Sequence, residues 1–470
     1  MLGATLQLVL LVMLTHKLKA GDYGRLALFA SAYSLAITLF YNPWRHALLR
    51  FLPSRPQGRR RFLQHLLGGV TLSACITLLI TLLVATTLPG NGLFLAALAI
   101  AVLAGGWVEI NLEYFRRTLT PTSYARLFLS RSLMQLLFVA AGVWMDGTVV
   151  GAIAGLTASH LFAALATPLR DVWRGQWRMK SLANRMLRAD LRSNMQKWLL
   201  YALPLTFAEF VSTAMVYTDR LMIAAFLGIA DTGRYSAPHD LAWMGLHVMS
   251  LVAYLAFFPM VIEATERKEH GKRREALRNG FTLLFGLSLA ATLGLVMLAH
   301  SLAGLALGTE YQDGAALLMQ IIAVVHLIHA LKVYWIDLAF SLHKKTWPLV
   351  LIGIFGILSN ILFNAWLLPL HGIKGAAVAT GLALLISTIL SALVARKMHL
   401  ADYPVCRTDL AKIFAAACCM GLVLAILPPA GNLPALMALV LVGAGTFLTV
   451  LWKLQLSMLA DFPSNRNNCS

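Results

Sequence analysis

The chain has 470 residues, of which 59% are hydrophobic and only 13% are charged, and its formal net charge is +19. Soluble proteins contain about 25% charged residues, so this composition excludes a chain built of ordinary soluble domains. The basic excess lies in short gaps between long apolar stretches, where an anionic membrane surface explains it better than nucleic acid does.

Fourteen apolar stretches follow one another along the sequence. They cover approximately residues 1–16, 23–43, 63–88, 92–115, 122–145, 148–168, 198–226, 238–262, 279–305, 313–340, 346–368, 373–397, 408–428 and 433–455. Most reach the length of about 20 residues that a membrane-spanning helix needs. None alternates like a strand of an outer-membrane barrel, and lipid offers backbone groups no hydrogen-bond partners. The sequence therefore predicts an all-α polytopic membrane protein.

The first stretch is shorter than the others. Residues 1–14 fall below the roughly 17 residues that span a bilayer comfortably. A cleaved signal peptide is the alternative, but the stretch lacks a basic start, and residues 16–19 (His-Lys-Leu-Lys) are a poor cleavage site. We predict a shortened first helix.

Lysine and arginine are concentrated at every second connection, starting with the one after the second stretch. Counted with the adjoining ends of the stretches, the loops that begin near residues 42, 116, 170, 263, 341, 396 and 452 hold 31 of the 39. Cytoplasmic loops of membrane proteins carry such an excess. The pattern predicts that both termini and the gap at residues 170–197 are cytoplasmic.

The gap at residues 170–197 mixes tryptophan, methionine and leucine with eight basic residues. This composition is typical of an amphipathic helix that lies on a membrane surface. We expect it to be a cytoplasmic linker between an N-lobe of six spans (residues 1–169) and a C-lobe of six spans (198–397). Residues 398–470 would then supply two extra helices and a short cytoplasmic tail.

Two pairs of short segments indicate that the lobes are related. The turns after the first and seventh spans share three residues at a constant offset, Asp22, Gly24 and Arg25 against Asp231, Gly233 and Arg234. The turns into the sixth and twelfth spans contain Trp144, Gly147, Gly151 and Ala152 and, correspondingly, Trp366, Gly372, Gly375 and Ala376. Together they predict a parallel duplication of a six-helix unit, which in transporters places the substrate path between two lobes.

Two charged residues lie at similar depth in sequential spans, Glu109 in the fourth and Arg131 in the fifth. Ionisable side chains inside a membrane are costly unless they face water or pair with a partner. Arg131 is therefore predicted either to contact an anionic substrate or to form a structural ion pair with Glu109. The residues alone leave both hypotheses open.

The tenth span carries His326, His329, Lys332 and Asp337. A spacing of three places the first three along one slowly drifting side of a helix, which we expect to face the interior. Such a cationic surface suits a diphosphate or acidic sugars, and histidine also titrates near neutral pH. The alternative is a structural role, with Lys332 bound to Asp337 or to a backbone carbonyl.

Three segments resemble a known family. Residues 18–27 (LKAGDYGRLA) look like the first turn of polysaccharide-type flippases, and residues 219–220, 227–228 and 233–235 are similar to their seventh-span signature. Residues 360–377 (NILFNAWLLPLHGIKGAA) resemble their most distinctive stretch. These are the Wzx-like flippases of lipid-linked oligosaccharides, in the MOP superfamily that also contains the MATE drug exporters.

The resemblance implies two helical bundles around a central cavity. It further implies that an undecaprenyl-diphosphate-linked oligosaccharide crosses the bacterial inner membrane by alternating access, for O-antigen, capsule or exopolysaccharide synthesis. The implied partners are this lipid-linked oligosaccharide, membrane lipids, and the polymerase and glycosyltransferases of the same process, without any nucleic acid.

The seventh span contains Glu209 near its middle and Asp219-Arg220 near its end. Buried carboxylates couple export to cations in MATE relatives, so the resemblance makes Glu209 a candidate for such coupling. A protonated Glu209 bonded to a neighbouring helix is the alternative, and Pro204 predicts a bend nearby that exposes backbone groups. We expect Asp219 and Arg220 to be structural and to close the turn into the eighth span.

Two other classes of function are alternatives to a flippase. A MATE-like exporter of small amphipathic molecules is the main alternative, although Arg131 and Lys332 suit an anion better than a cation. A membrane glycosyltransferase or polymerase usually has a large periplasmic loop, whereas the outer gaps here are short, so we predict no enzymatic activity. Neither Cys-x-x-Cys nor His-Glu-x-x-His occurs, and no metal or other cofactor is expected, while coupling to H⁺ or Na⁺ stays open.

Overall fold

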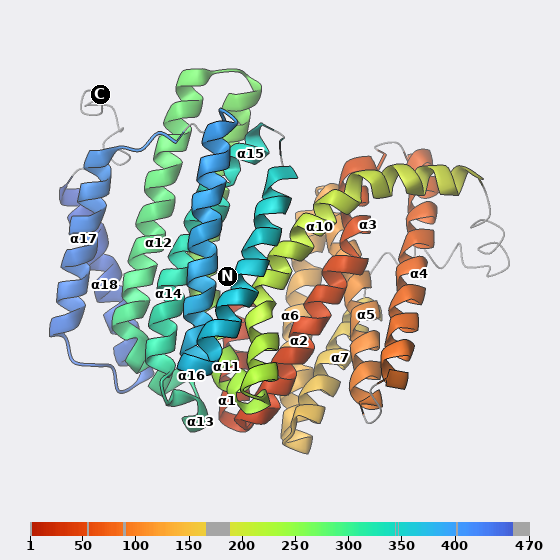
Figure 1. The fold of residues 1–470 in the computed structure, drawn as a ribbon, viewed down its shortest axis with the longest axis horizontal. Helices are drawn as coiled ribbons and strands as arrows, with labels where there is room; N and C mark the ends of the chain where they lie inside the picture. The colour runs from red at the N-terminus through yellow and green to blue at the C-terminus, as the bar shows by residue number, and fades with distance from the viewer. Residues whose placement is uncertain are drawn as a thin grey trace. The chain divides into compact units, whose positions relative to one another are not determined.

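The computed structural model describes residues 2–53, 56–87, 91–165, 189–343, 345, 347–400 and 403–454. In these ranges every regular element is helical (Figure 1), and eleven helices are long and apolar enough to cross a membrane. One of them, α16 (Trp347–Lys397), is two helices joined at Gly372, where the backbone leaves helical geometry. Two shorter apolar helices bring the number within the described ranges to fourteen. The predicted all-α polytopic membrane fold is confirmed.

The described residues up to Arg220 form the first compact unit. Its helices are α1 (Leu2–Lys17), α2 (Ala20–Phe40), α3 (Asn42–Phe51), α4 (Pro56–Thr87), α5 (Gly92–Arg117), α6 (Pro121–Asp146), α7 (Val149–Leu165) and most of α10 (Ala189–Phe226). Helices α6 and α7 form a closely packed hairpin, and α1 packs along α6. The short first stretch is therefore a packed helix.

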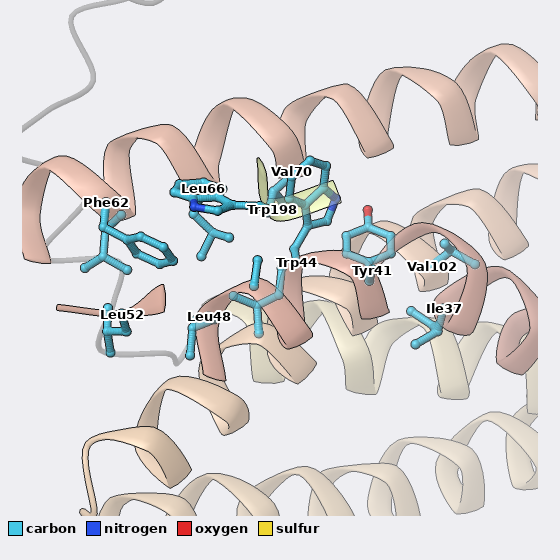
Figure 2. Packing of buried hydrophobic residues seen from close by; sticks show 13 residues of the cluster. Ile37, Tyr41, Trp44, Leu48, Leu52, Phe62, Leu66, Val70, Val102 and Trp198 are labelled. Carbon is cyan, nitrogen blue, oxygen red and sulfur yellow. The ribbon is translucent and has the colours of Figure 1, made fainter. Parts of the chain in front are cut away.

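Helix α3 belongs to the core, although most of its residues lie in a predicted gap between spans. Pro43 lies in its first turn, where the missing N–H is not needed. Trp44 and Leu48, one turn apart, are almost fully buried. Figure 2 shows these two side chains packed with Leu66 of α4 and Trp198 of α10. The residues of this basic gap thus form a core helix, because one side of the helix is apolar and buried.

The described residues from Leu221 onward form the second compact unit. Besides the end of α10 and all of α16, its helices are α11 (Ile229–Glu266), α12 (His270–Ala306), α13 (Thr309–Gln312), α14 (Ala315–Leu331), the π-helix η1 (Lys332–Ile336), α15 (Leu338–Leu342), α17 (Arg407–Ile426) and α18 (Leu433–Lys453). Helices α17 and α18 pack against each other and on α12, and Phe285, Ile413 and Phe447 belong to one buried cluster. These are the two extra helices predicted after the C-lobe.

The two units share local features at the positions predicted to be repeated. Helix α2 begins at Ala20 and α11 begins at Ile229, which keeps the constant offset seen in the sequence. The shared segments are therefore the first turns of two helices rather than connecting turns. Each first turn contains the same ion pair, Asp22–Arg25 at 3.7 Å and Asp231–Arg234 at 3.0 Å.

The second pair of repeated segments also adopts one geometry twice. Gly147, between α6 and α7, has φ of +68°, and Gly372, inside α16, has φ of +58°. A few residues later, a Cβ on Gly151 would lie 2.1 Å from the carbonyl oxygen of Gly142, and one on Gly375 would lie 2.4 Å from that of Leu367. Both hairpins therefore need a left-handed glycine and then a close approach of two backbones.

The predicted linker can be followed only at its end. Residues 170–188 lie outside the described ranges, and the remainder of the linker is the start of α10, which continues without a break into the seventh span. The two compact units divide within α10, at Arg220. The lobe boundaries at residues 169, 198 and 397 stay a prediction, and residues 455–470 of the tail lie outside the described ranges.

Candidate functional site

The first unit contains a polar network centred on α3. One side of α3 is apolar and buried, as described above, and the other side carries Asn42, Arg45 and His46. These three side chains contact carboxylates on two different helices, α5 and α10. None of the three was singled out from the sequence. The amphipathic spacing of Trp44 and Leu48 is the signal that could have revealed this helix and its polar side.

Arg131 of α6 and Glu109 of α5 are in direct contact. Arg131 Nη1 donates a hydrogen bond to Glu109 Oε1 at 2.6 Å, and the second carboxylate oxygen lies 3.9 Å from Nη2 of Arg45. The side chains of Arg131 and Glu109 are 18% and 21% exposed. Glu109 is therefore held between two guanidinium groups. The structure brings the two predicted residues together, and both their structural and their substrate role remain hypotheses.

Glu113, one turn after Glu109 on α5, extends the network. Its carboxylate lies 3.2 Å from Arg45 Nη2 and 3.4 Å from Arg116 Nη1, and the side chain is almost fully buried. Arg45 also donates from Nη1 to the Asn42 side-chain oxygen at 2.8 Å. Arg45 thus joins both glutamates of α5 to the first turn of α3.

Glu209 of α10 forms the other end of the network. Its Oε2 accepts a hydrogen bond from Asn42 Nδ2 at 2.5 Å and lies 3.4 Å from His46 Nε2. The side chain is half exposed, and Pro204 lies inside the same helix. A chain of polar contacts therefore runs from α10 through α3 and α5 to α6.

The charges of this network nearly balance, because the three glutamates are matched by Arg45, Arg116 and Arg131. Several of these side chains retain partial exposure although they belong to an apolar, membrane-spanning unit. Such groups avoid lipid and face water or a polar ligand. The network thus identifies a polar surface of the first unit.

In the second unit, Lys332 and Asp337 form an ion pair. Lys332 Nζ lies 2.5 Å from Asp337 Oδ2, and the two side chains are 12% and 14% exposed. The pair closes across the π-helix η1, where Asp337 N–H donates to the Lys332 carbonyl at 2.9 Å. This wider turn brings Asp337 over Lys332, although a spacing of five residues would separate them on a continuous α-helix. The structural hypothesis for Lys332 requires a contact with Asp337, and the structure shows that contact.

His326 and His329 of α14 surround a tryptophan of α11. Their ring centroids lie 4.8 and 4.9 Å from that of Trp243. His239 stacks on the same indole at 5.5 Å, and His247 lies 6.4 Å from His326. We did not predict the three α11 residues, although their spacing of four along a helix was a visible signal. The histidines therefore lie in a ring-lined cluster, and a substrate role for them stays a hypothesis.

Asp219 and Arg220, near the end of α10, are almost fully buried. The guanidinium carbon of Arg220 lies 5.4 Å from the ring centroid of Tyr217, a cation–π contact. This burial agrees with the structural role that we expect for them. Among the described residues, no three or more His, Cys, Asp or Glu side chains are arranged to hold a metal ion.

Comparison with known proteins gives the family. The profile of the family described as "Polysaccharide biosynthesis protein" matches residues 1–265, which is more than half of the chain. The chain belongs to this family. The resemblance to this family seen in the sequence is thereby confirmed, and its apolar helices make this family member a multi-pass membrane protein.

Individual relatives are distant. The chain is 20% identical over 315 residues to the probable low-salt glycan biosynthesis flippase Agl15 of Haloferax volcanii, a match that covers 64% of this chain and only 61% of the relative. Its fold is similar to that of the lipid II flippase MurJ in an inward closed conformation, with a TM-score of 0.76, 11% identity and coverage of 95% and 96% of the two chains. An inward-facing MATE multidrug transporter gives a TM-score of 0.58, 12% identity and coverage of 85% and 94%. At these identities the structural matches establish the fold alone.

Proposed function

We propose that this polysaccharide biosynthesis protein is a flippase for an undecaprenyl-diphosphate-linked oligosaccharide. The proposed cargo has an apolar tail, a diphosphate and a glycan, and only the polar part needs protein to cross the hydrocarbon layer. The resulting oligosaccharide would serve O-antigen, capsule or exopolysaccharide synthesis. Family membership and the flippase names of Agl15 and MurJ support this proposal.

The observation that carries the proposal is the partly exposed polar network of the first unit. Arg45 and Arg131 offer planar guanidinium groups that match phosphate oxygens. Both contact Glu109 in the described state. A diphosphate would therefore have to compete with Glu109 for the two arginines, so that binding of the cargo and breaking of the network become one step. Alternating access needs such a difference in contacts between two states.

A second contact for the cargo is proposed in the other unit. Lys332, His326 and His329 would meet the diphosphate or the sugars once Lys332 is released from Asp337. The half-exposed Glu209, bonded to Asn42 and close to His46, is the proposed carrier of a coupling H⁺ or Na⁺.

The proposed location is the bacterial inner membrane, with both termini in the cytoplasm. Reporter fusions at Gly175 and Gly271 should report the cytoplasm, and fusions at Gly233 and Gly372 should report the periplasm. Gly175 lies outside the described ranges. A reversed signal at either pair of positions would contradict the topology.

Transport can be tested with the purified chain in liposomes that contain a radiolabelled undecaprenyl-diphosphate oligosaccharide in both leaflets. A membrane-impermeant glycosidase added outside should release nearly all of the label with the flippase, but only the outer-leaflet share without it. Empty liposomes are the control for leakage. Export of a fluorescent cation without any movement of the lipid-linked oligosaccharide would instead favour the MATE-like alternative.

A further inference from the structure

The second unit contains a groove at the end of its helices where the basic loops gather. It is bounded by the first turns of α12, by η1 and α15, and by the residues between α16 and α17. Its lining includes Arg273, Leu277, Trp335, Leu342, His343 and Tyr403. None of these residues belongs to the polar network or to the histidine cluster described above.

The aromatic wall of the groove is fixed in place. The Tyr403 hydroxyl donates a hydrogen bond to the Ile336 carbonyl at 3.0 Å, within the π-helical turn. Burial raises the pKa of Tyr403 to about 12, so the hydroxyl keeps its proton and continues to donate. Trp335 lies between Tyr403 and Phe281, with ring centroids 6.1 and 4.9 Å away. The wall is therefore preformed and does not depend on a ligand.

The groove combines an apolar floor with a basic edge. Leu277 and Leu342 line the floor, whereas Arg273 and the exposed His343 supply the basic groups. Arg274 is exposed nearby, and Lys272 is paired with Glu269 at 3.0 Å. The start of α12 therefore carries three basic side chains, Lys272, Arg273 and Arg274, against the carboxylates of Glu269 and Glu275. Tyrosine and tryptophan beside such a charge are typical of the level of lipid headgroups.

We propose that this groove binds the headgroup of an anionic phospholipid of the cytoplasmic leaflet. The guanidinium group of Arg273 would hold the phosphate, since its planar fork matches two phosphate oxygens. The leucines and Trp335 would contact the glycerol and the start of the acyl chains. Basic pockets between membrane helices recognise anionic lipids in this way. The proposal concerns a resident lipid and is independent of which cargo the protein moves.

The test uses the full chain in phosphatidylcholine nanodiscs that contain increasing amounts of brominated phosphatidylglycerol or brominated phosphatidylcholine. Bromine quenches tryptophan fluorescence at short range, and the difference between the natural chain and Trp335→Phe isolates the signal of Trp335. Brominated phosphatidylglycerol should reach half of its maximal quenching at a concentration about fivefold lower than brominated phosphatidylcholine does. This factor corresponds to the roughly 1 kcal/mol by which one basic residue attracts an anionic lipid.

A matched pair of variants locates the site. Arg273→Gln should remove this fivefold preference, whereas Arg274→Gln, one residue further and outside the lining of the groove, should keep it. His343→Gln is a second variant on an exposed residue, and it should weaken the preference without risk to the fold. Circular dichroism of each variant checks that the helices are retained.

Three results would overturn the proposal. Equal quenching by the two brominated lipids would mean that the groove does not select an anionic headgroup. An equal loss in Arg273→Gln and Arg274→Gln would mean that only diffuse surface charge attracts the lipid. Displacement of brominated phosphatidylglycerol by millimolar inorganic phosphate would identify free phosphate, rather than a lipid, as the ligand.

Discussion

The two compact units share their helix starts and hairpins but differ in their polar interiors. Each begins an apolar helix with the same aspartate–arginine pair and forms a hairpin around a left-handed glycine. The first unit contains a network of arginines and glutamates, whereas the second contains a cluster of histidines and aromatic rings with one lysine–aspartate pair. The features that set the backbone path are thus shared by the two units, whereas the polar residues that we propose to meet cargo or ions differ.

The contrast has a physical basis. A position where two backbones touch favours glycine, because a Cβ there would push the two helices apart and destabilise the hairpin. A buried charge needs a partner, but the partner can be replaced together with it. The two kinds of position therefore make different predictions for substitutions.

The largest effect should come from breaking the network of the first unit. Arg131→Ala leaves Glu109 with only the more distant Arg45, and removing one partner of a buried ion pair costs about 3–5 kcal/mol. We expect a lower thermal midpoint in detergent, less protein in the membrane and no export of polysaccharide. The double variant Arg131→Ala/Glu109→Gln should regain most of the stability and abundance.

Export separates the two roles of Arg131. If Arg131 contacts the diphosphate, the stable double variant should still export no polysaccharide. Full export by the double variant would reduce Arg131 to a structural residue and would leave Lys332 as the cation to examine.

The next largest effect should be the same in both units. Gly151→Ala and Gly375→Ala each place a methyl group within 2.4 Å or less of a backbone carbonyl oxygen, and overpacking of this kind costs about 1–3 kcal/mol. Differential scanning fluorimetry should show a similar drop for the two variants. Gly294→Ala in α12 is the control, because a Cβ there meets nothing within 4 Å, and it should be neutral or stabilising. A drop in only one unit would contradict the equivalence of the hairpins.

The sequence predicted most of the fold because apolar length and charge alternation decide it. The fourteen helices, the short first helix and the repeated segments could all be read in advance, although the segments at Asp22 and Asp231 are helix starts and not the predicted turns. Helix α3 was missed because its basic side, with Arg45 and His46, resembles a cytoplasmic loop. The start of α11 lies nine residues before the predicted residue 238, and the helix continues through Pro238.

The candidate site was predicted less completely for a similar reason. Glu109 and Arg131 stand out as charges in apolar stretches, so their contact could be anticipated. Arg45, which links Glu109 to Glu113, lies outside any apolar stretch, and only the packing of α3 brings it there. The π-helical turn at Lys332 is also a tertiary feature, and no spacing rule predicts it.

A smaller effect on stability is expected in the histidine cluster of the second unit. His326 Nε2 is buried and forms no hydrogen bond within the described residues, while the ring packs against Trp243. His326→Phe keeps an aromatic ring of similar size, so the free energy of unfolding should change by about 1.5 kcal/mol at most. Export should nevertheless fall if the imidazole contacts cargo or carries a proton. If His326→Phe lost as much stability as Arg131→Ala, the polar interiors of the two units would contribute equally to folding.

The smallest effect should come from the feature that the units share most closely. The pairs Asp22–Arg25 and Asp231–Arg234 lie in first helical turns and are largely exposed, with arginine exposures of 59% and 49%. An aspartate near a helix N-terminus contributes about 0.3–1 kcal/mol, partly through the helix dipole, and an exposed ion pair adds little. Asp22→Asn and Asp231→Asn should therefore lower the thermal midpoint slightly and by similar amounts, and high salt should shrink both changes. Asp313→Asn is a control with the same change of charge, because Asp313 precedes α14 and forms no ion pair among the described salt bridges. A loss of export in one variant at unchanged stability would mean that its first turn acts in transport rather than in folding alone.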